Sequence, residues 1–106
     1  MARNGVFSHR WIDLCQRHGL EVQVIDCAWG DGAPADRIEA ALTADAGQQI
    51  KAVLITHNET AIGVRSDIAS IRNAIDSATH SVLLFVDCVS TLASMPFAMD
   101  EWGVDI

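Results

Sequence analysis

Two short polar clusters hold most of the side chains in this sequence that could do chemistry. Residues 56–60 read Thr-His-Asn-Glu-Thr and follow the apolar run 52–55, while residues 87–91 read Asp-Cys-Val-Ser-Thr and follow the apolar run 82–86. Parallel strands end together at one rim of a sheet, and ligands bind outside that rim. We therefore expect both clusters to lie on the same rim of one sheet.

Asp87 is the most informative residue of the two clusters. A carboxylate directly after five apolar residues is expected to be partly buried, and burial disfavours its charged form. A cation about 4 Å away would contribute about 4 kcal/mol at an effective dielectric constant of about 20. No Lys or Arg is close in sequence, so a distant residue or a cationic ligand would have to supply the charge. The alternative is an Asp that caps the turn after its strand by accepting backbone hydrogen bonds.

Other chemistries have weaker support from the residue types and their spacing. His57 and Glu59 lie two residues apart and, with Asp87, suggest a metal, but there is no second His and no spaced Cys pair, so we predict no metal site. A nucleophile at Ser90 or Cys88 would lack the Gly-x-Ser-x-Gly elbow. There is also no Gly-x-Gly-x-x-Gly dinucleotide loop.

The strands that would position these clusters are short. The runs 52–55 and 82–86 are rich in branched residues and do not alternate with polar ones, which is typical of parallel strands buried on both faces. A weaker strand is predicted over residues 21–26. Three helical patterns lie around these strands. They comprise Phe7, Trp11, Leu14, Cys15 and His18 in the first, Ile38, Ala41, Leu42 and Asp45 in the second, and Val64, Ile68, Ile71, Ile75 and Ala78 in the third.

The ends of the predicted helices also carry signals. Pro34 suits the first turn of the second helix and Gly47 lies just past its end, while Ser66 is the expected N-cap of the third. The order α-β-α-β-α-β predicts right-handed crossovers and an α/β fold in three layers, with helices over a mainly parallel sheet. Three strands do not close a domain, and residues 100–106 end where another strand is expected to begin. We therefore expect a fragment.

Composition narrows the classes of partner. The chain has 106 residues, half of them apolar, and a formal net charge of −7, which argues against nucleic acid and anionic membranes as partners. Cys15, Cys27 and Cys88 are odd in number and far apart, so we expect reduced packing residues and not a disulfide framework. No apolar run approaches the ~20 residues of a membrane span, and no signal peptide is expected, so the cytoplasm is the predicted location.

Three segments together resemble the class V aminotransferases. Residues 51–64, which end in Glu-Thr-Ala-Ile-Gly-Val, are similar to the family signature, residues 84–90 to its cofactor-binding strand, and residues 100–105 to the stretch that shortly precedes its Ser-Gln-Lys. The beginning of the chain (residues 1–8) and the Trp29-Gly30 turn resemble the serine–glyoxylate branch. The resemblance covers essentially all 106 residues. Cysteine desulfurases, which share the fold but usually have Gln near the position of Ser90, rank second.

This resemblance implies part of the large domain of a fold-type-I enzyme that uses pyridoxal 5′-phosphate (PLP). Phe7 would stack on one face of the cofactor ring, and the alternative for Phe7 is ordinary helix packing with Trp11. Val89 would pack on the opposite face of the ring. Thr60 would donate a hydrogen bond to the ring hydroxyl. Asp87 would bind the protonated pyridine nitrogen and keep the ring cationic.

The sequence also departs from the family pattern. Ile62 stands where the family usually has Thr and could disturb its turn, Cys88 stands where Gly is common, and Thr91 where Ser is common. The resemblance places the phosphate-binding turn, the Schiff-base lysine and the carboxylate-binding arginine outside the chain. Lys51 is expected at the opposite end of the sheet and is no substitute. No catalytic residue is therefore predicted within residues 1–106, and we expect the isolated chain to be inactive.

The activity implied for the parent enzyme is transfer of an amino group from serine, or alanine, to glyoxylate. Relatives form homodimers, so a homodimeric parent is implied as well. Two alternatives stay open at this point. The chain could be a small non-catalytic α/β interaction module or remnant, or a fragment of a cysteine desulfurase-like PLP enzyme.

Overall fold

The computed structural model describes residues 1–106, which form three helices and six strands. The helices are α1 (Val6–Arg17), α2 (Ala35–Ala44) and α3 (Ile68–Ser77). The strands are β1 (Ala2–Arg3), β2 (Ile25–Asp26), β3 (Ala52–Thr56), β4 (Asn58–Glu59), β5 (Val64–Arg65) and β6 (Leu83–Asp87).

The strands pair in three short sheets, of which two are parallel. The central pair is β3 with β6, which are parallel over five residue pairs from Ala52–Leu83 to Thr56–Asp87. β1 pairs with β2, also in parallel. β4 and β5 form an antiparallel hairpin. The apolar runs thus became the parallel strands that the sequence predicts.

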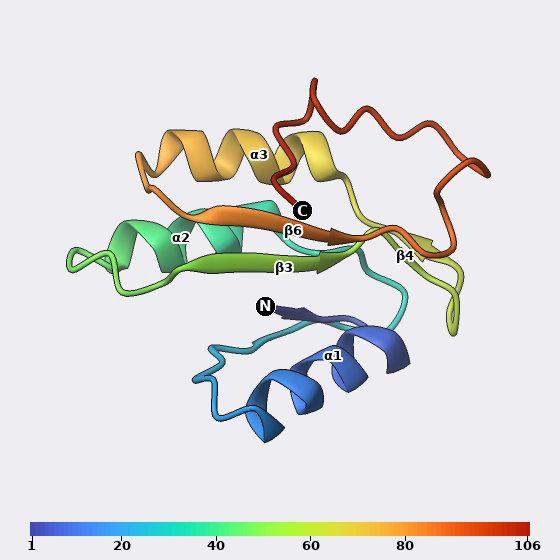
Figure 1. Ribbon diagram of the computed structural model, residues 1–106, viewed down its shortest axis with the longest axis horizontal. Coiled ribbons are helices and arrows are strands. Elements are labelled where there is room, and N and C mark those ends of the chain that lie inside the picture. Colours follow the sequence, from blue (N-terminus) through green and yellow to red (C-terminus); the bar gives the residue numbers. More distant parts are fainter.

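Helices cover both sides of the central strands. α1 and α3 lie on opposite sides of β3 and β6 (Figure 1), and α2 packs beside α3. The main core lies on the α2–α3 side, where Ile71, Ile75 and Leu84 are fully buried. α3 buries a stripe at helical spacing because its isoleucines recur every three or four residues. The three-layer α/β prediction is therefore confirmed.

The apolar pattern that predicts the first helix is not the face that α1 buries. Ser8 and Ile12 are the buried residues of α1, whereas Phe7 is 41% and Leu14 52% exposed. The prediction located the helix correctly, but the packing face is different. The reason is that α1 begins against a buried polar group, and a small serine fits there.

Several predicted boundaries are wrong by a few residues. Asp67, not Ser66, caps α3, because its carboxylate accepts a hydrogen bond from the Ser70 amide at 3.0 Å. The Ser66 hydroxyl instead donates to the Thr56 carbonyl at 3.2 Å. Pro34 is the N-cap of α2 and does not lie in its first turn.

Strand boundaries also differ from the prediction. Val64 lies in β5 and not in the third helix, and the strand predicted over residues 21–26 shortens to β2. The two-residue strands β1, β4 and β5 were not predicted, since two residues are too few to show a period of alternation.

Near the C-terminus the chain returns to the free edge of β6. The Val86 amide donates to the Ile106 carbonyl at 2.8 Å, and the Ile106 amide donates to the Leu84 carbonyl at 3.3 Å. Hydrogen bonds on either side of one partner residue are typical of parallel strands. Ile106 therefore extends the parallel pairing to the second side of β6.

Two further observations bear on the composition-based predictions. Cys15, Cys27 and Cys88 are free thiols of intermediate exposure. None of the three helices is long and apolar enough to cross a lipid bilayer.

Candidate functional site

The carboxyl ends of β3 and β6 lie side by side. Thr56 at the end of β3 pairs with Asp87 at the end of β6, and the His57 amide donates to the Asp87 carbonyl at 3.0 Å. Both polar clusters therefore begin at one rim, as predicted. The β4–β5 hairpin and the start of α1 lie at the same end of the molecule (Figure 1).

Asp87 is half-buried at this rim, as expected for a carboxylate that follows a buried strand. Its Oδ1 accepts a hydrogen bond from the Val89 amide at 3.1 Å, so Asp87 does cap the turn. The other carboxylate oxygen has no hydrogen-bond partner, and no ion pair involves Asp87. Capping and ligand binding are thus compatible, because the cap occupies one oxygen only.

His57 holds the turn that follows Asp87. Its ring is 2% exposed, and Nδ1 lies 3.0 Å from the Thr91 hydroxyl. Phe97 and Trp102 pack around the ring with centroids 5.6 and 5.8 Å away. Burial, and then the charge of Arg65, lower the pKa of His57. The imidazole is therefore neutral near pH 7 and acts as a packing and hydrogen-bonding group.

A second contact joins the same turn to the hairpin. Asn58 Nδ2 donates to the Ser90 hydroxyl at 3.1 Å, and the Ser90 hydroxyl lies 3.3 Å from the Asn58 carbonyl. β4 is therefore bonded directly to the segment that carries Asp87 and Val89.

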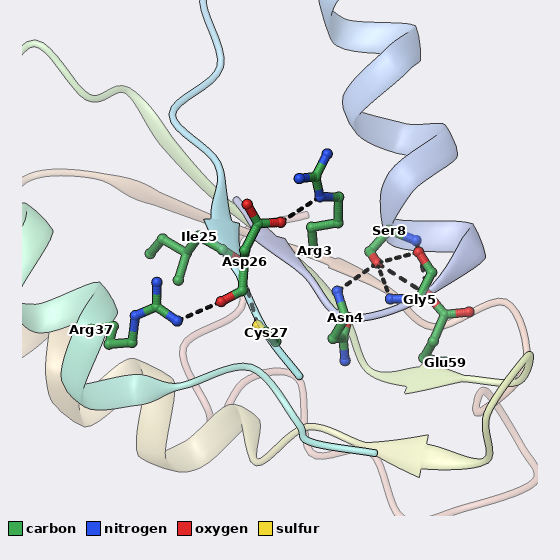
Figure 2. Close-up of polar contacts among 9 residues, drawn as sticks. All are labelled: Arg3, Asn4, Gly5, Ser8, Ile25, Asp26, Cys27, Arg37 and Glu59. Atoms are coloured by element: carbon green, nitrogen blue, oxygen red, sulfur yellow. Dashed lines mark hydrogen bonds and ion pairs between the residues drawn. The ribbon is translucent and has the colours of Figure 1, made fainter. Parts of the chain in front are cut away.

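Glu59 joins the hairpin to α1. Its side chain is fully buried, and its carboxylate accepts hydrogen bonds from the amides of Phe7 and Ser8, both at 3.0 Å to Oε2. Figure 2 shows the Glu59 carboxylate reaching toward Gly5 and Ser8 at the start of the helix. The segment of Phe7 is thus attached to the hairpin that continues into Thr60.

The four residues that the family resemblance singles out occupy three segments that meet at β4. Phe7 lies in the first turn of α1, Thr60 directly follows β4, and Asp87 and Val89 lie at and after the end of β6. Phe7 is 41% exposed and Val89 is 93% exposed. The Thr60 hydroxyl is exposed and has no hydrogen-bond partner within the chain.

These four side chains fit a flat, cationic aromatic group in their chemistry. Val89 is almost fully exposed, and Phe7 is partly exposed with the Arg10 guanidinium 5.7 Å from its ring centroid; apolar side chains of this kind suit contact with the faces of a ring. One hydroxyl and one carboxylate oxygen remain free to bond polar atoms on its edge. The donor and acceptor set therefore agrees with the PLP ring that the resemblance implies.

The residues considered for a metal point apart. The His57 ring contacts Thr91, whereas the Glu59 carboxylate turns to the start of α1. They diverge because β3 ends at Thr56 and the chain bends before β4, which removes the alternation that would align them. No group of three or more His, Cys, Asp or Glu side chains is placed to hold a metal ion.

Two of the positions that depart from the family pattern, Ile62 and Thr91, lie in turns that form in this chain. With Ile62 present the hairpin turn still closes, since the amides of Ile62 and Gly63 donate to the Glu59 carbonyl at 3.2 and 2.9 Å. Thr91 is buried against His57. Lys51 precedes β3 at the opposite end of the strand, where Nζ donates to the Gln48 carbonyl at 2.6 Å.

An ion pair near the rim links β1 with β2. Arg3 Nε lies 2.6 Å from Asp26 Oδ1, and Arg37 donates to the Asp26 carbonyl (Figure 2). The hydrogen bond from Arg3 lowers the pKa of Asp26 and raises that of Arg3. The side chains of Arg3 and Asp26 are 41% and 64% exposed, so solvent screens the pair and it contributes little to stability.

Sequence reasoning placed Glu59 and His57 in a polar turn and missed their roles. Gly5 is a sequence signal that could have indicated the role of Glu59. A helix that begins directly after glycine has no side-chain N-cap of its own, and a buried acceptor from elsewhere in the chain can take that part.

A comparison with protein families identifies the family of the chain. The family model described as Aminotransferase class-V matches residues 4–106. The chain belongs to the class-V aminotransferase family.

Several relatives of this class-V aminotransferase chain are named for glyoxylate. The chain is 66% identical to the L-aspartate–glyoxylate aminotransferase of Paracoccus denitrificans, and the match covers 99% of this chain and 26% of that protein. It is 57% identical to the serine–glyoxylate aminotransferase of Methylorubrum extorquens, covering 98% of this chain and 26% of that protein. The chain thus spans about a quarter of the length of the curated relatives it matches.

The structural comparison identifies the fold. The crystal structure of an alanine–glyoxylate aminotransferase from Nostoc sp. matches with a TM-score of 0.85 and 28% identity, over 99% of this chain and 26% of that one. The class-V aminotransferase chain therefore has the fold of part of the three-layer large domain of fold-type-I aminotransferases. This confirms both the family and the fold class that the sequence predicts.

Proposed function

We propose that this chain supplies the contacts to the PLP ring in an aminotransferase that moves an amino group to glyoxylate. The observation that carries the proposal is Asp87, which ends β6 at the rim with one carboxylate oxygen unpartnered. A half-buried carboxylate without a cation in its own chain is suited to a cationic ligand. The family supplies one, since PLP carries a protonated pyridine nitrogen.

Each of the other residues then has a role in holding the ring. Phe7 and Val89 cover its two faces, and the Thr60 hydroxyl donates to the ring hydroxyl. Asp87 holds the proton on the pyridine nitrogen. PLP bound in this way supplies an electron sink for the substrate carbanion. The residues of this chain bind and orient the cofactor, and the proposal assigns them no proton transfer from the substrate.

The substrates proposed are amino acids and glyoxylate. The names of the relatives pair glyoxylate with aspartate, serine or alanine. Glyoxylate is the substrate common to all three names, which supports it as the amino-group acceptor. For the donor we propose serine or a related amino acid. The proposal further includes a homodimeric parent in the cytoplasm.

The first test is the intact mass of the protein as its source cell makes it, measured after capture with an antibody against this segment. A species several times heavier than 11.4 kDa supports an aminotransferase of which this chain is one segment. A species at 11.4 kDa would contradict catalysis by the natural product and favour the interaction module or remnant.

The second test is an assay of that natural protein with PLP and glyoxylate. Glycine formed with serine, alanine or aspartate supports the proposal and identifies the donor. Sulfide released from cysteine instead would favour the desulfurase-like alternative. Light scattering reports the dimer, and cell fractionation reports the location.

Asp87→Asn is the decisive variant in this assay. Loss of an ion pair worth about 4 kcal/mol corresponds to a fall in kcat/KM of up to about 1,000-fold. Asp100→Asn is the matched control, because Asp100 is exposed and its side chain makes no hydrogen bond. Equal activity of both variants would contradict the role of Asp87.

A further inference from the structure

Glu59 is the most deeply buried carboxylate of the chain, and its partners are far away in sequence. It is 0% exposed, and the amides it binds, those of Phe7 and Ser8, lie 52 and 51 residues away. Burying a carboxylate costs several kcal/mol unless it is hydrogen-bonded. The Ser8 hydroxyl adds a third contact, at 3.2 Å from Oε2.

The carboxylate acts on the start of α1. The first amides of a helix have no partner within the helix, and the helix dipole favours a negative charge at this end. Gly5, the N-cap, has no side chain to bond them. Moreover, a Cβ atom on Gly5 would overlap the Glu59 side chain. The cap of α1 is therefore provided by the β4–β5 hairpin.

The same residue also closes the hairpin turn that carries Thr60. The amides of Ile62 and Gly63 donate to the Glu59 carbonyl at 3.2 and 2.9 Å. The side chain of Glu59 thus binds the backbone of Phe7, while its main chain fixes the turn that begins with Thr60. One residue determines where two proposed ring contacts stand relative to each other.

We propose that Glu59 is a positioning residue of the cofactor site. Its carboxylate holds the start of α1 against the hairpin, so that the Phe7 ring and the Thr60 hydroxyl are in place before the PLP ring arrives. The inference rests on the proposed function, since it acts through the Phe7 contact. Preorganisation of this kind strengthens binding because less ordering remains to be done when the ligand binds.

The variant that tests this is Glu59→Gln, which keeps the shape of the side chain but removes its charge and one acceptor. Hydrogen bonds to charged groups are the stronger ones, so we expect PLP to bind about 10- to 100-fold more weakly. In the cofactor-free protein, the amides of Phe7 and Ser8 should exchange hydrogen faster. Glu21→Gln is the matched control, because Glu21 is exposed and its side chain makes no hydrogen bond.

A double-mutant cycle separates positioning from general stabilisation. The natural full-length protein is compared with Glu59→Gln, with Phe7→Leu and with the double variant, using the PLP dissociation constant and the circular dichroism of the bound cofactor. If Glu59 acts through Phe7, Glu59→Gln weakens binding little further once Phe7 is replaced. Additive losses, or an unchanged dissociation constant in Glu59→Gln, would overturn the inference.

Two further outcomes are distinguishable. If the natural protein itself binds no PLP, the proposed function fails and the inference with it. If the natural protein binds PLP and only the cycle is additive, the proposed function stands and Glu59 is merely structural. Should Glu59→Gln not fold, Glu59→Asp keeps the charge on a shorter side chain, and the same cycle with Phe7→Leu decides the question.

Discussion

The side chain of Glu59 occupies the space in which a Cβ atom of residue 5 would lie, so Gly5 and Glu59 are sterically coupled. Cγ and Cδ of Glu59 are the nearest atoms to that position. Gly5 has a φ of 172°, an extended conformation that any residue adopts. The requirement for glycine at this position is therefore one of space and not of backbone conformation.

Gly5→Ala is expected to destabilise the chain. The added methyl group must displace the Glu59 carboxylate from the amides of Phe7 and Ser8 or shift the start of α1. Overpacking of this kind costs about 1–3 kcal/mol of the free energy of unfolding, which denaturant titration measures.

Gly47→Ala is the control for this substitution. A Cβ there would meet only the Gln49 side chain, at 3.6 Å, so a small effect is expected. The double variant Gly5→Ala/Glu59→Ala should lose less free energy of unfolding than the sum of the two single variants, because Glu59→Ala removes the side chain with which the new methyl group clashes. A Gly5→Ala chain as stable as the original would contradict the packing described.

Leu84 and Leu83 are neighbours in β6 with opposite environments. Leu84 is 0% exposed and Leu83 is 46% exposed, because successive side chains of a strand point to opposite faces. We expect Leu84→Ala to lower the free energy of unfolding of this chain by about 2–5 kcal/mol through the cavity it leaves. Leu83→Ala should change it far less, and similar losses in both variants would place the core elsewhere.

Asp45 is expected to make the stability of the chain decrease at acid pH. Hydrogen bonds from the backbone amides of Ile50 and Gln49, and then one from His80, lower the pKa of Asp45. A carboxyl group with a lower pKa in the folded than in the unfolded state stabilises the fold above its unfolded pKa, about 4. That contribution is lost as the pH falls from there through the folded pKa.

Asp45→Asn should therefore flatten the decline in unfolding midpoint below about pH 4. Asp100→Asn, which replaces an exposed side chain without a hydrogen bond, should leave the decline unchanged. Equal acid sensitivity of the original chain and Asp45→Asn would show that other carboxylates dominate this region.

His57 gives a second pH dependence at higher pH. Its pKa is lowered in the folded chain, first by burial and then by Arg65, so the unfolded chain binds the proton more readily. Its contribution to stability is complete above the unfolded pKa of about 6.5 and declines as the pH falls toward the folded pKa. We expect the unfolding midpoint to decrease as the pH is lowered below about 6.5.

His57→Phe keeps an aromatic ring between Phe97 and Trp102 and removes the titration. The slope of midpoint against pH in this interval should decrease in that variant. His18→Gln is the control, since His18 is exposed. A slope that is unchanged in His57→Phe but reduced in His18→Gln would contradict the assignment of this pH dependence to His57.

The central part of the fold was predictable because it depends on local patterns. The apolar runs 52–55 and 82–86 predict β3 and β6, since strands buried on both faces need apolar residues throughout. Helix positions were also predictable from periodicity. The two-residue strands and the packing face of α1 were not, because the first are too short for a period and the second depends on which group α1 meets.

The sequence by itself determined the α/β class, the order of the main elements and the polar rim at which Asp87 lies. Residues adjacent in the chain or one helical turn apart carry that information. Only the tertiary structure decided that Glu59 caps α1 and that His57 holds the turn after Asp87. Those contacts join residues 52 and 34 positions apart. A buried polar group takes as partners whichever donors and acceptors the folded backbone brings within hydrogen-bond distance.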